Sequence, residues 1–420
     1  MHSRSDLDPV LPGLPFALDL EAVSERFQDV WGREEKQPVA ISGCKRVDTK
    51  YEPEVRCVAA YELSGRRADG RCRGTIGVVE IDASGASHRL FRDDPELSGL
   101  AHACDRERMR ERLSTLPGAT AQRPVEVRRI TPVRYKPRRS CVLRYTLSSR
   151  AGQRTLVGKL VAGEGGEQRM RALLSLHEAS RATPQMPRIL EPLAYWPDLR
   201  LLVQPAVTGG RELARSAFDL SLPPAMRCRW IGDAGTGVAA LHSTVTVAAP
   251  RRTIEDDLRE LRAYEHLFAR LAPDLARSFE GAVASIARLA GHRPEPAPVA
   301  SHGALRADQF LIDDSGRLVL IDFDGFCWAN PARDVGNLLA YLDWKAIHSP
   351  DRAAPAEEAR DAFLDGYGAV APTGEGAWLE LYRTASMLKI AGRRLRSLSF
   401  EEWGFLPELL DVALARLGAC

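Results

Sequence analysis

At 420 residues the chain is longer than one ordinary domain, and we expect two or three packed units. Hydrophobic residues make up 45% and charged residues 27%, which is typical of a globular protein and excludes a disordered or fibrous one. The formal net charge is +2, so composition predicts neither a nucleic acid nor a membrane surface as a partner.

No window approaches eighteen consecutive apolar residues. Acidic residues interrupt the first twenty positions, where a secretory signal would be basic and then apolar. We therefore expect a cytoplasmic protein.

The first half of the chain contains a repeat. Residues 50–63 (KYEPEVRCVAAYEL) and 134–147 (RYKPRRSCVLRYTL) align without a gap. The six identical pairs are Tyr51/Tyr135, Pro53/Pro137, Cys57/Cys141, Val58/Val142, Tyr61/Tyr145 and Leu63/Leu147. Each copy alternates apolar and polar residues, then has a turn rich in Gly, Ser and Arg and a second apolar run, which predicts a β-hairpin. We therefore expect two related β-rich units. The alternative is that the two hairpins are similar by chance.

Helical spacing covers residues 14–31, 104–116 and 167–176, and two more strands surround a turn at residues 197–198. Helices then dominate, over residues 226–243, 253–271, 273–290, 355–370 and pieces of 375–418. A hairpin over residues 309–322, with its turn at 314–316, interrupts them. The predicted class is α+β, with a β-rich lobe followed by a helical lobe.

Residues 301–342 (SHGALRADQFLIDDSGRLVLIDFDGFCWANPARDVGNLLAYL) resemble the aminoglycoside phosphotransferase and choline kinase family, relatives of protein kinases. The family pattern is His-Gly-Asp, a hydrophobic residue, three variable residues, Asn or Gln, a hairpin ending in Ile-Asp-Phe-Asp/Glu, and Asp-Pro-x-x-Asp before a helix. The matching positions are His302, Gly303, Leu305, Gln309, Leu311, residues 318–324, Pro331 and Asp334. The resemblance implies a two-lobed protein-kinase-like fold.

Phosphoryl transfer relies on positioning and on metal ions that neutralise charge. The resemblance implies that Asp322 holds Mg²⁺ against the phosphates of ATP, with Gln309 as a second contact through its side-chain carbonyl; both offer the oxygen ligands that Mg²⁺ prefers. The alternative for Gln309 is a backbone partner in its loop. Asp324 is either a further metal neighbour or an exposed loop acid. Asp334 is expected to cap the next helix or to brace the loop.

Ala304 departs from the family, which has there the aspartate that accepts the proton of the attacking hydroxyl. General-base help is worth roughly a hundred- to ten-thousandfold in rate. The chain is therefore a slow kinase, a kinase with a replacement base, a pseudokinase, or a chain with an introduced substitution. The candidate for a replacement base is Asp308.

Residues 133–161 are similar to the first three strands of such kinases. The resemblance implies that Lys159, one of only seven lysines, reaches the α- and β-phosphates. An acidic residue of the following helix should pair with it, Glu167 first and Glu178 in reserve.

The turn before this lysine strand is basic rather than glycine-rich. Its residues Arg138, Arg139 and Ser140 would cover the phosphates through guanidinium and backbone N–H groups; the alternative is a solvated basic cluster. The strand at residues 199–207 resembles the hinge, where backbone groups from Gln204 to Ala206 would hold adenine.

The N-terminal copy lacks the lysine, because Gly77 and Val78 align with Gly158 and Lys159. It resembles the cap that precedes the kinase lobes of some bacterial sugar kinases, such as maltokinases. We expect an N-terminal cap over residues 1–125, an N-lobe over 126–207 and a helical C-lobe over 208–420.

The expected function is an ATP-dependent phosphotransferase, using ATP or another nucleoside triphosphate with Mg²⁺, that acts on a hydroxyl of a small molecule such as a sugar or aminoglycoside. The alternative is a nucleotide-binding pseudokinase with a regulatory role and a protein partner. The acids Glu255, Asp256 and Asp257 are expected to serve a helix dipole, with attraction of a cationic acceptor as the alternative.

Overall fold

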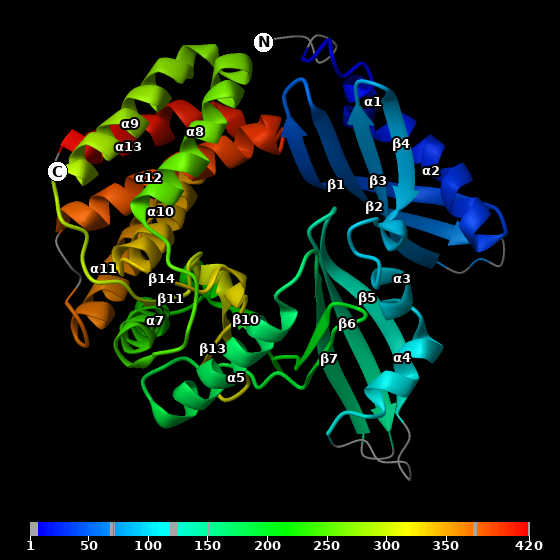
Figure 1. Cartoon of the computed structure of the whole chain (residues 1–420), viewed down its shortest axis with the longest axis horizontal. Coiled ribbons are helices and arrows are strands. Elements are labelled where there is room, and N and C mark those ends of the chain that lie inside the picture. The colour runs from blue at the N-terminus through cyan, green and yellow to red at the C-terminus, as the bar shows by residue number, and fades with distance from the viewer. Residues whose placement is uncertain are drawn as a thin grey trace. The chain divides into compact units, whose positions relative to one another are not determined.

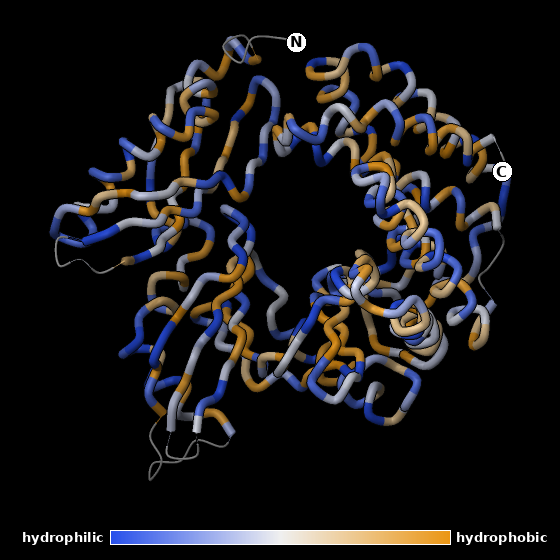
Figure 2. Tube along the Cα trace, turned by 180° about the vertical axis from the view of Figure 1, so that it is seen from behind, coloured by the Kyte–Doolittle hydropathy of each residue, from blue (hydrophilic) through white to orange (hydrophobic). Residues whose placement is uncertain are grey.

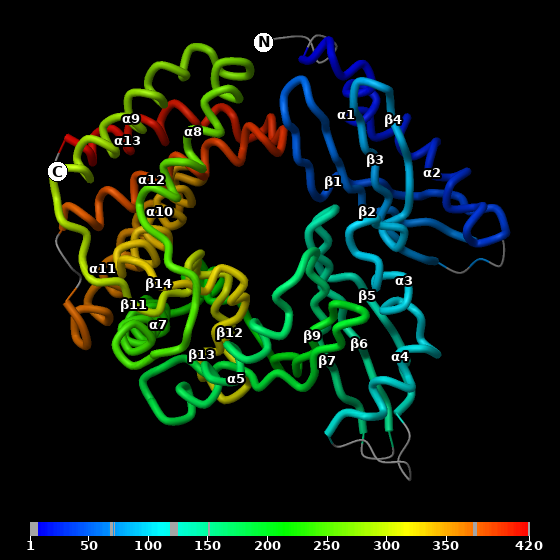
Figure 3. Tube along the Cα trace, viewed as in Figure 1, coloured from blue at the N-terminus to red at the C-terminus, as the bar shows by residue number. Residues whose placement is uncertain are grey.

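The computed structural model describes residues 7–67, 70, 72–117, 125–149, 152–372 and 376–418. The chain divides into two compact units. The first holds residues 1–170, 192–206 and 396–398, and the second holds 171–191, 207–395 and 399–420. Sheets dominate the first unit and helices the second (Figures 1 and 3). Among the described residues no helix has the length and apolar content that crossing a membrane requires.

The first unit begins with two helices and a four-stranded antiparallel sheet in the order β1-β2-β3-β4. These elements are α1 Leu14–Leu18, α2 Leu20–Glu35, β1 Val39–Glu52, β2 Arg56–Arg67, β3 Cys72–Asp82 and β4 Gly85–Leu90. Helix α2 packs against the sheet, where a Cβ added at Gly77 would lie 2.7 Å from the ring of Phe27. This close approach explains why glycine stands at position 77.

A second sheet follows in the same unit, in the order β5-β6-β7-β9-β8. The elements of this part are α3 Leu100–Ala103, α4 Arg106–Leu113, β5 Glu126–Lys136, β6 Ser140–Ser149, β7 Gly152–Val161, β8 Ala194–Trp196 and β9 Leu201–Pro205. Helix α5 Gly166–Ala182 begins in the first unit and belongs to the second from Arg171 onward. Hydrophobic and hydrophilic residues both occur along the strands of the two sheets (Figure 2). Burial alternates along β6, whereas successive residues are buried in β2 and β3. Both predicted hairpins are present, because β2 pairs with β3 and β6 with β7, although their turns include residues 68, 69, 71, 150 and 151, which lie outside the described residues.

The two sheets repeat the same packing. Tyr51 lies opposite Cys57 in the first sheet, as Tyr135 lies opposite Cys141 in the second. The Tyr61 hydroxyl donates to the backbone oxygen of Ala17 at 2.5 Å, and the Tyr145 hydroxyl donates in the same way to Ala103 at 2.9 Å. The two copies are thus similar in structure as well as in sequence.

The repeat also extends further than the sequence analysis recognised. Asp8 accepts from the Tyr51 hydroxyl at 2.8 Å and from a backbone N–H in the β1–β2 turn at 2.7 Å. Asp94 accepts from the Tyr135 hydroxyl at 2.5 Å and from the Arg138 N–H at 2.8 Å. The shared pattern, Asp-Pro-x-Leu-x-Gly-Leu-x-x-Ala-x-Asp at residues 8–19 and 94–105, begins a helical arm in each copy.

The register of the strands corrects the alignment of the lysine position. Val58 lies opposite Glu80, and its counterpart Val142 lies opposite Lys159. Glu80, rather than Val78, therefore stands in the first sheet where Lys159 stands in the second. The ungapped sequence alignment failed because the connection between β2 and β3 is longer than the connection between β6 and β7. Matching Gly77 with Gly158 hid this difference in length.

One hydrophobic core joins both sheets. It includes Val58 and Val78 from the first sheet and Leu143, Leu156 and Val203 from the second, all of which are buried. The predicted boundary after residue 125 follows residues 118–124, which lie outside the described part of the chain. Burying apolar surface in common ties the two copies together as one unit.

The second unit contains most of the helices. They are α6 Leu213–Ala217, α7 Pro224–Thr244, α8 Ile254–Leu271, α9 Pro273–Gly291, α10 Ala332–His348, α11 Ala353–Gly368, α12 Gly376–Arg396 and α13 Leu406–Gly418. The predicted hairpin is β12 Phe310–Ile312 with β13 Leu318–Leu320, and β10 Arg211–Glu212 extends it. A further pair, β11 Val299–Ser301 with β14 Cys327–Ala329, was not predicted. The α+β class, with a β-rich part followed by a helical part, is confirmed.

We expect the substitution Asp94→Ala to lower the free energy of unfolding by about 2–4 kcal/mol, because a buried hydroxyl and a partly buried N–H both lose their acceptor. Urea denaturation followed by fluorescence measures the change. The exposed neighbour Glu96→Ala is the control and should stay within about 0.5 kcal/mol of the wild type. Equal effects of the two substitutions would contradict the role given to Asp94.

Candidate active site

The predicted site residues divide between the two units. Lys159 lies in the first unit on β7, opposite Val142 of β6 and Leu202 of β9, and it is half-buried. Its neighbour Gly158 is packed so closely that an added Cβ would lie 2.6 Å from the ring of Tyr145. The lysine is thus carried by a central strand whose backbone position is fixed.

The acidic candidates on α5 are both exposed. Glu167 lies in the first turn of the helix, and Glu178 lies near its end. Pairing of Lys159 with either residue stays a prediction.

The basic turn, residues 136–140, is tightly held. The Arg139 N–H donates to the Lys136 oxygen at 3.0 Å, and the Arg139 oxygen accepts from Ala162 at 2.9 Å. Arg138 adopts the left-handed conformation with φ of 59°, and Asp94 accepts its backbone N–H. Ser140 begins β6 at the end of this turn.

Carboxylates of the first copy face the basic turn. The Glu80 carboxylate lies 3.2 Å from Nε of Arg138. Glu80, which stands in the first sheet where Lys159 stands in the second, thus pairs with Arg138, a candidate phosphate contact. Burial raises the pKa of Asp48 on β1, against the lowering effect of Lys136 and Arg139. The turn is therefore not a freely solvated basic cluster.

The predicted hinge is the end of β9. Gln204 lies opposite Val157, and the Ala206 N–H donates to the Thr155 oxygen at 3.1 Å. That N–H is engaged by the sheet, so a base bound here would use other backbone groups of the segment.

In the second unit one carboxylate braces the loop over residues 302–309, which we call the catalytic loop. Asp334 is 0% exposed. It accepts from the His302 N–H at 2.6 Å, from the Gly303 N–H at 2.8 Å and from Nε2 of His242 at 3.3 Å. Burial acts to raise the pKa of Asp334, but the His242 hydrogen bond and charge outweigh it and lower the pKa. Of its two expected roles, bracing the loop is the one these contacts show.

The rest of the loop is held by helix α10. Arg333 donates to the Gly303 oxygen at 2.8 Å, and Nδ2 of Asn337 donates to the Leu305 oxygen at 2.7 Å. Nε2 of His302 lies 3.0 Å from the Ile321 oxygen, and burial lowers the pKa of this histidine. The backbone around Ala304 is thus fixed on both sides.

Ala304 itself is half-buried at the place of the missing aspartate. Asp308, the candidate replacement base, is exposed and lies 2.9 Å from Nε of Arg306. The charge of Asp322 also contributes to raising the pKa of Arg306, after Tyr341 and Asp308 and against burial. Arg306 is a site residue that the sequence analysis missed, although its place two residues after Ala304 could have indicated it.

The metal candidates lie around the β12–β13 hairpin. Gln309 is 3% exposed, and its side-chain oxygen accepts the Arg306 N–H at 2.8 Å, which is the backbone role weighed as its alternative. Asp322 follows β13 in the left-handed conformation, with φ of 70°. Asp324 is exposed in the next short helix. A non-glycine residue in the left-handed conformation, two residues after a buried strand, is a strained position of the kind found at functional sites.

Asp257 is the second residue that the sequence analysis misjudged. It is buried and accepts from Nη2 of Arg333 at 2.6 Å and from Nζ of Lys389 at 2.5 Å. Asp256, in contrast, accepts the Thr253 N–H and caps the start of α8. Asp257 therefore anchors the arginine that holds Gly303, and its distant partner on α12 explains why local pattern did not reveal it.

Residues 167–373 match the model of a family described as the phosphotransferase enzyme family. No curated protein matches the chain. Among solved structures, spectinomycin phosphotransferase APH(9)-Ia in complex with ADP and spectinomycin has a TM-score of 0.50 at 14% identity, over 74% of this chain and 98% of that chain. At this identity the likeness shows the fold alone.

Two other solved structures are similar with TM-scores below 0.5. A glucosamine kinase has a TM-score of 0.47 at 17% identity, over 91% of this chain and 93% of that chain. Choline kinase LicA from Streptococcus pneumoniae has a TM-score of 0.48 at 13% identity, over 75% of this chain and 99% of that chain.

We expect Asp334→Asn to lower the free energy of unfolding at pH 7 by about 3 kcal/mol, because a buried, paired carboxylate is lost. The folded pKa lies below the ordinary value of 3.8, so this stabilisation is present above pH 3.8 and is lost as the pH falls through the folded pKa. Urea denaturation at several pH values should show the two proteins converging in acid. The exposed Asp351→Asn is the control, and a gap that does not depend on pH would contradict the assignment.

Proposed function

Because residues 167–373 match the model of the phosphotransferase enzyme family, we propose that the chain binds ATP, or another nucleoside triphosphate, with Mg²⁺ and transfers the γ-phosphate to a hydroxyl of a small molecule. A sugar or an aminoglycoside is the proposed acceptor class. The similar spectinomycin phosphotransferase structure contains ADP, which supports a nucleotide as the phosphate donor.

The observation that carries this proposal is the bracing of the catalytic loop. Asp334 and Arg333 hold both backbone sides of Gly303, and Asn337 holds Leu305. Phosphoryl transfer depends mainly on positioned groups, so a loop fixed by buried charges suits it.

The residues present fit a magnesium ion held partly by its substrate. Among the described residues no group of three or more His, Cys, Asp or Glu side chains could hold a metal. Mg²⁺ commonly uses one or two protein oxygens together with substrate phosphates. Asp322 would supply the carboxylate and Gln309 an amide oxygen, with Asp324 nearby in sequence. The bound ion would neutralise charge on the phosphates.

The first unit would supply cations and backbone groups for the nucleotide. We assign Lys159 to the α- and β-phosphates, with Glu167 as its partner, and the segment from Gln204 to Ala206 to the base. In the basic turn, Arg138, Arg139 and Ser140 remain the phosphate contacts. The Glu80 carboxylate beside Arg138 would compete with phosphate for that guanidinium group.

A nucleotide-binding pseudokinase is the second candidate, and Ala304 is the observation that favours it. An alanine accepts no proton, and the Asp308 carboxylate is engaged by Arg306. Such a protein would keep nucleotide binding and act on a protein partner through its conformation. The two candidates therefore differ in turnover rather than in ATP binding.

Nucleotide binding is tested by thermal shift on the full chain. ATP with Mg²⁺ should raise the melting temperature, since a ligand at a hundredfold excess over its Kd adds about 2.7 kcal/mol. Lys159→Ala should remove most of the rise, whereas Lys45→Ala, an exposed lysine of β1, should keep it. No rise in the wild type would exclude both candidates.

Turnover is tested by release of phosphate from ATP with Mg²⁺ in the wild type and in Ala304→Asp. Restoring a general base should raise the rate by roughly a hundred- to ten-thousandfold. Asp308→Ala should leave the wild-type rate unchanged, because Arg306 holds that carboxylate. Turnover by Ala304→Asp alone would establish the pseudokinase, and a large loss in Asp308→Ala would show that Asp308 is the replacement base.

A further inference from the structure

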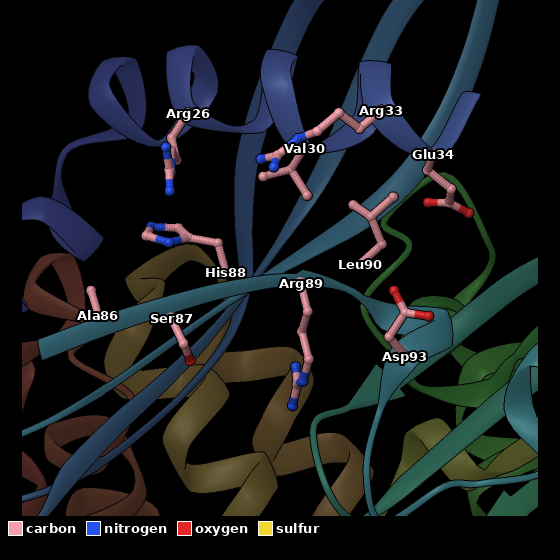
Figure 4. A pocket seen from close by; sticks show the side chains of 10 residues that line it. All are labelled: Arg26, Val30, Arg33, Glu34, Ala86, Ser87, His88, Arg89, Leu90 and Asp93. Carbon is pink, nitrogen blue, oxygen red and sulfur yellow. The ribbon is translucent and has the colours of Figure 1, made fainter. Parts of the chain in front are cut away.

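A polar cavity of about 500 Å³ lies in the N-terminal copy of the repeat, between helix α2 and strand β4. Figure 4 shows its lining, with Arg26 and Arg33 on the helix, and with His88 and Arg89 on opposite faces of the strand. We call it the cap pocket. It lies wholly within residues 26–93, so it is separate from Lys159 and from the catalytic loop.

The cap pocket has a small excess of positive charge. Two arginines of helix α2, Arg26 and Arg33, line it against the carboxylates of Glu34 and Asp93. Glu34 lies 3.3 Å from Nη1 of Arg92, outside the lining, and is paired there. Nε of Arg33 donates to the Asp29 oxygen at 3.2 Å, and no ion pair joins Arg26 or Arg33 to a carboxylate in the described part of the chain. Two guanidinium groups therefore line the cavity with Asp93 as the remaining carboxylate.

A buried ring nitrogen in the cap pocket also lacks a partner. Nε2 of His88 is buried and makes no hydrogen bond with the described residues. Arg89 lies on the other face of the strand, where its Nη2 is 3.6 Å from the Glu80 carboxylate and 3.9 Å from the Asp94 carboxylate (Figure 4). Buried polar groups are usually paired, so Nε2 of His88 indicates a partner that the chain itself does not supply.

The strand beside the cavity adds backbone donors. Strand β4 is at the edge of its sheet, next to β3 alone. In an antiparallel pair, alternate N–H groups point away from the neighbouring strand. These groups are directed outward along β4, where Ser87 and His88 line the cavity.

The C-terminal copy shows how the same scaffold looks without such a site. Asp19 and Asp105 cap equivalent helices, and Arg26 and Arg112 stand at the same distance after them. Arg112 is neutralised by Asp198, with Nη1 at 3.0 Å from the carboxylate, whereas Arg26 has no such partner. The first copy has no segment equivalent to the one that carries Asp198.

The histidine differs between the copies in the same way. His88 lies opposite Val79, and Val203 lies opposite Gly158 at the corresponding register. Val203 is fully buried in the core, while His88 lines the cavity. The N-terminal copy thus has a polar ring where its duplicate has an apolar side chain.

We propose that the cap pocket binds a small molecule through a phosphate group, held by Arg26, Arg33 and His88. Guanidinium forks and N–H groups suit phosphate oxygens, and the volume is within the range of small-molecule sites. The site is independent of the proposed phosphotransfer, since none of its residues belongs to the candidate active site.

Isothermal titration calorimetry on the full chain tests the proposal, with inorganic phosphate and glucose 6-phosphate as probes. Arg26→Ala and Arg33→Ala should each weaken binding about tenfold, because each removes a charge-assisted contact. His88→Val, which copies the second sheet, should also weaken it. Arg66→Ala, an exposed arginine of the same sheet, should not. Circular dichroism verifies that each variant is folded.

The two probes separate the sources of the phosphate group. Tighter binding of glucose 6-phosphate would identify a phosphate monoester as the ligand, and equal affinities would identify free phosphate. The proposal is overturned if neither probe binds at about 10 mM, or if the Arg26 and Arg33 variants bind as the wild type does. It is also overturned if Lys159→Ala alone abolishes binding, since the probe would then occupy the nucleotide site.

Discussion

The buried carboxylate of Asp334 is the contact on which the helical unit's site depends. It takes two successive N–H groups of the catalytic loop and the ring of His242, and its neighbour Arg333 holds the Gly303 oxygen. Arg333 is fixed in turn by Asp257, which also accepts from Lys389, far away along the chain. A buried charge is tolerated only when it is paired and hydrogen-bonded. The loop is therefore held by a connected set of charges rather than by its own short backbone.

The sheet unit is organised by repetition. Each copy has an aspartate that takes a tyrosine hydroxyl and a turn N–H, followed by a helical arm and a hairpin. The two copies carry opposite charges at one equivalent position, since Glu80 in the first copy corresponds to Lys159 in the second. Because Glu80 contacts Arg138, the two copies are coupled through the basic turn as well as through their shared core. The N-terminal copy is therefore part of the same folded unit and also touches the phosphate-contact candidates.

Ala304 stands in a loop whose backbone is held on both sides. The backbone on both sides of Ala304 keeps its partners, and Asp322 stays in its left-handed conformation after β13. Arg306 adds a cation whose pKa responds to Asp322. A supported loop with a missing base fits the slow enzyme and the pseudokinase equally, because both need the nucleotide to be positioned. The slow enzyme and the pseudokinase differ in proton transfer alone, for which a carboxylate at position 304 would be the acceptor.

The sequence by itself determined the α+β class, the resemblance to phosphotransferases and the first part of the repeat, because alternation and short motifs are local properties of the chain. It also identified the loop from His302 to Gln309 and the hairpin that precedes Asp322. Tertiary structure decided what depends on distant partners. Only the strand register showed that Glu80 stands at the place of Lys159, and only the contacts of α8 with α10 and α12 showed that Asp257 anchors Arg333 and accepts from Lys389. The cap pocket belongs to this second kind, since an arginine without a counter-charge is recognised only when its neighbours in space are known.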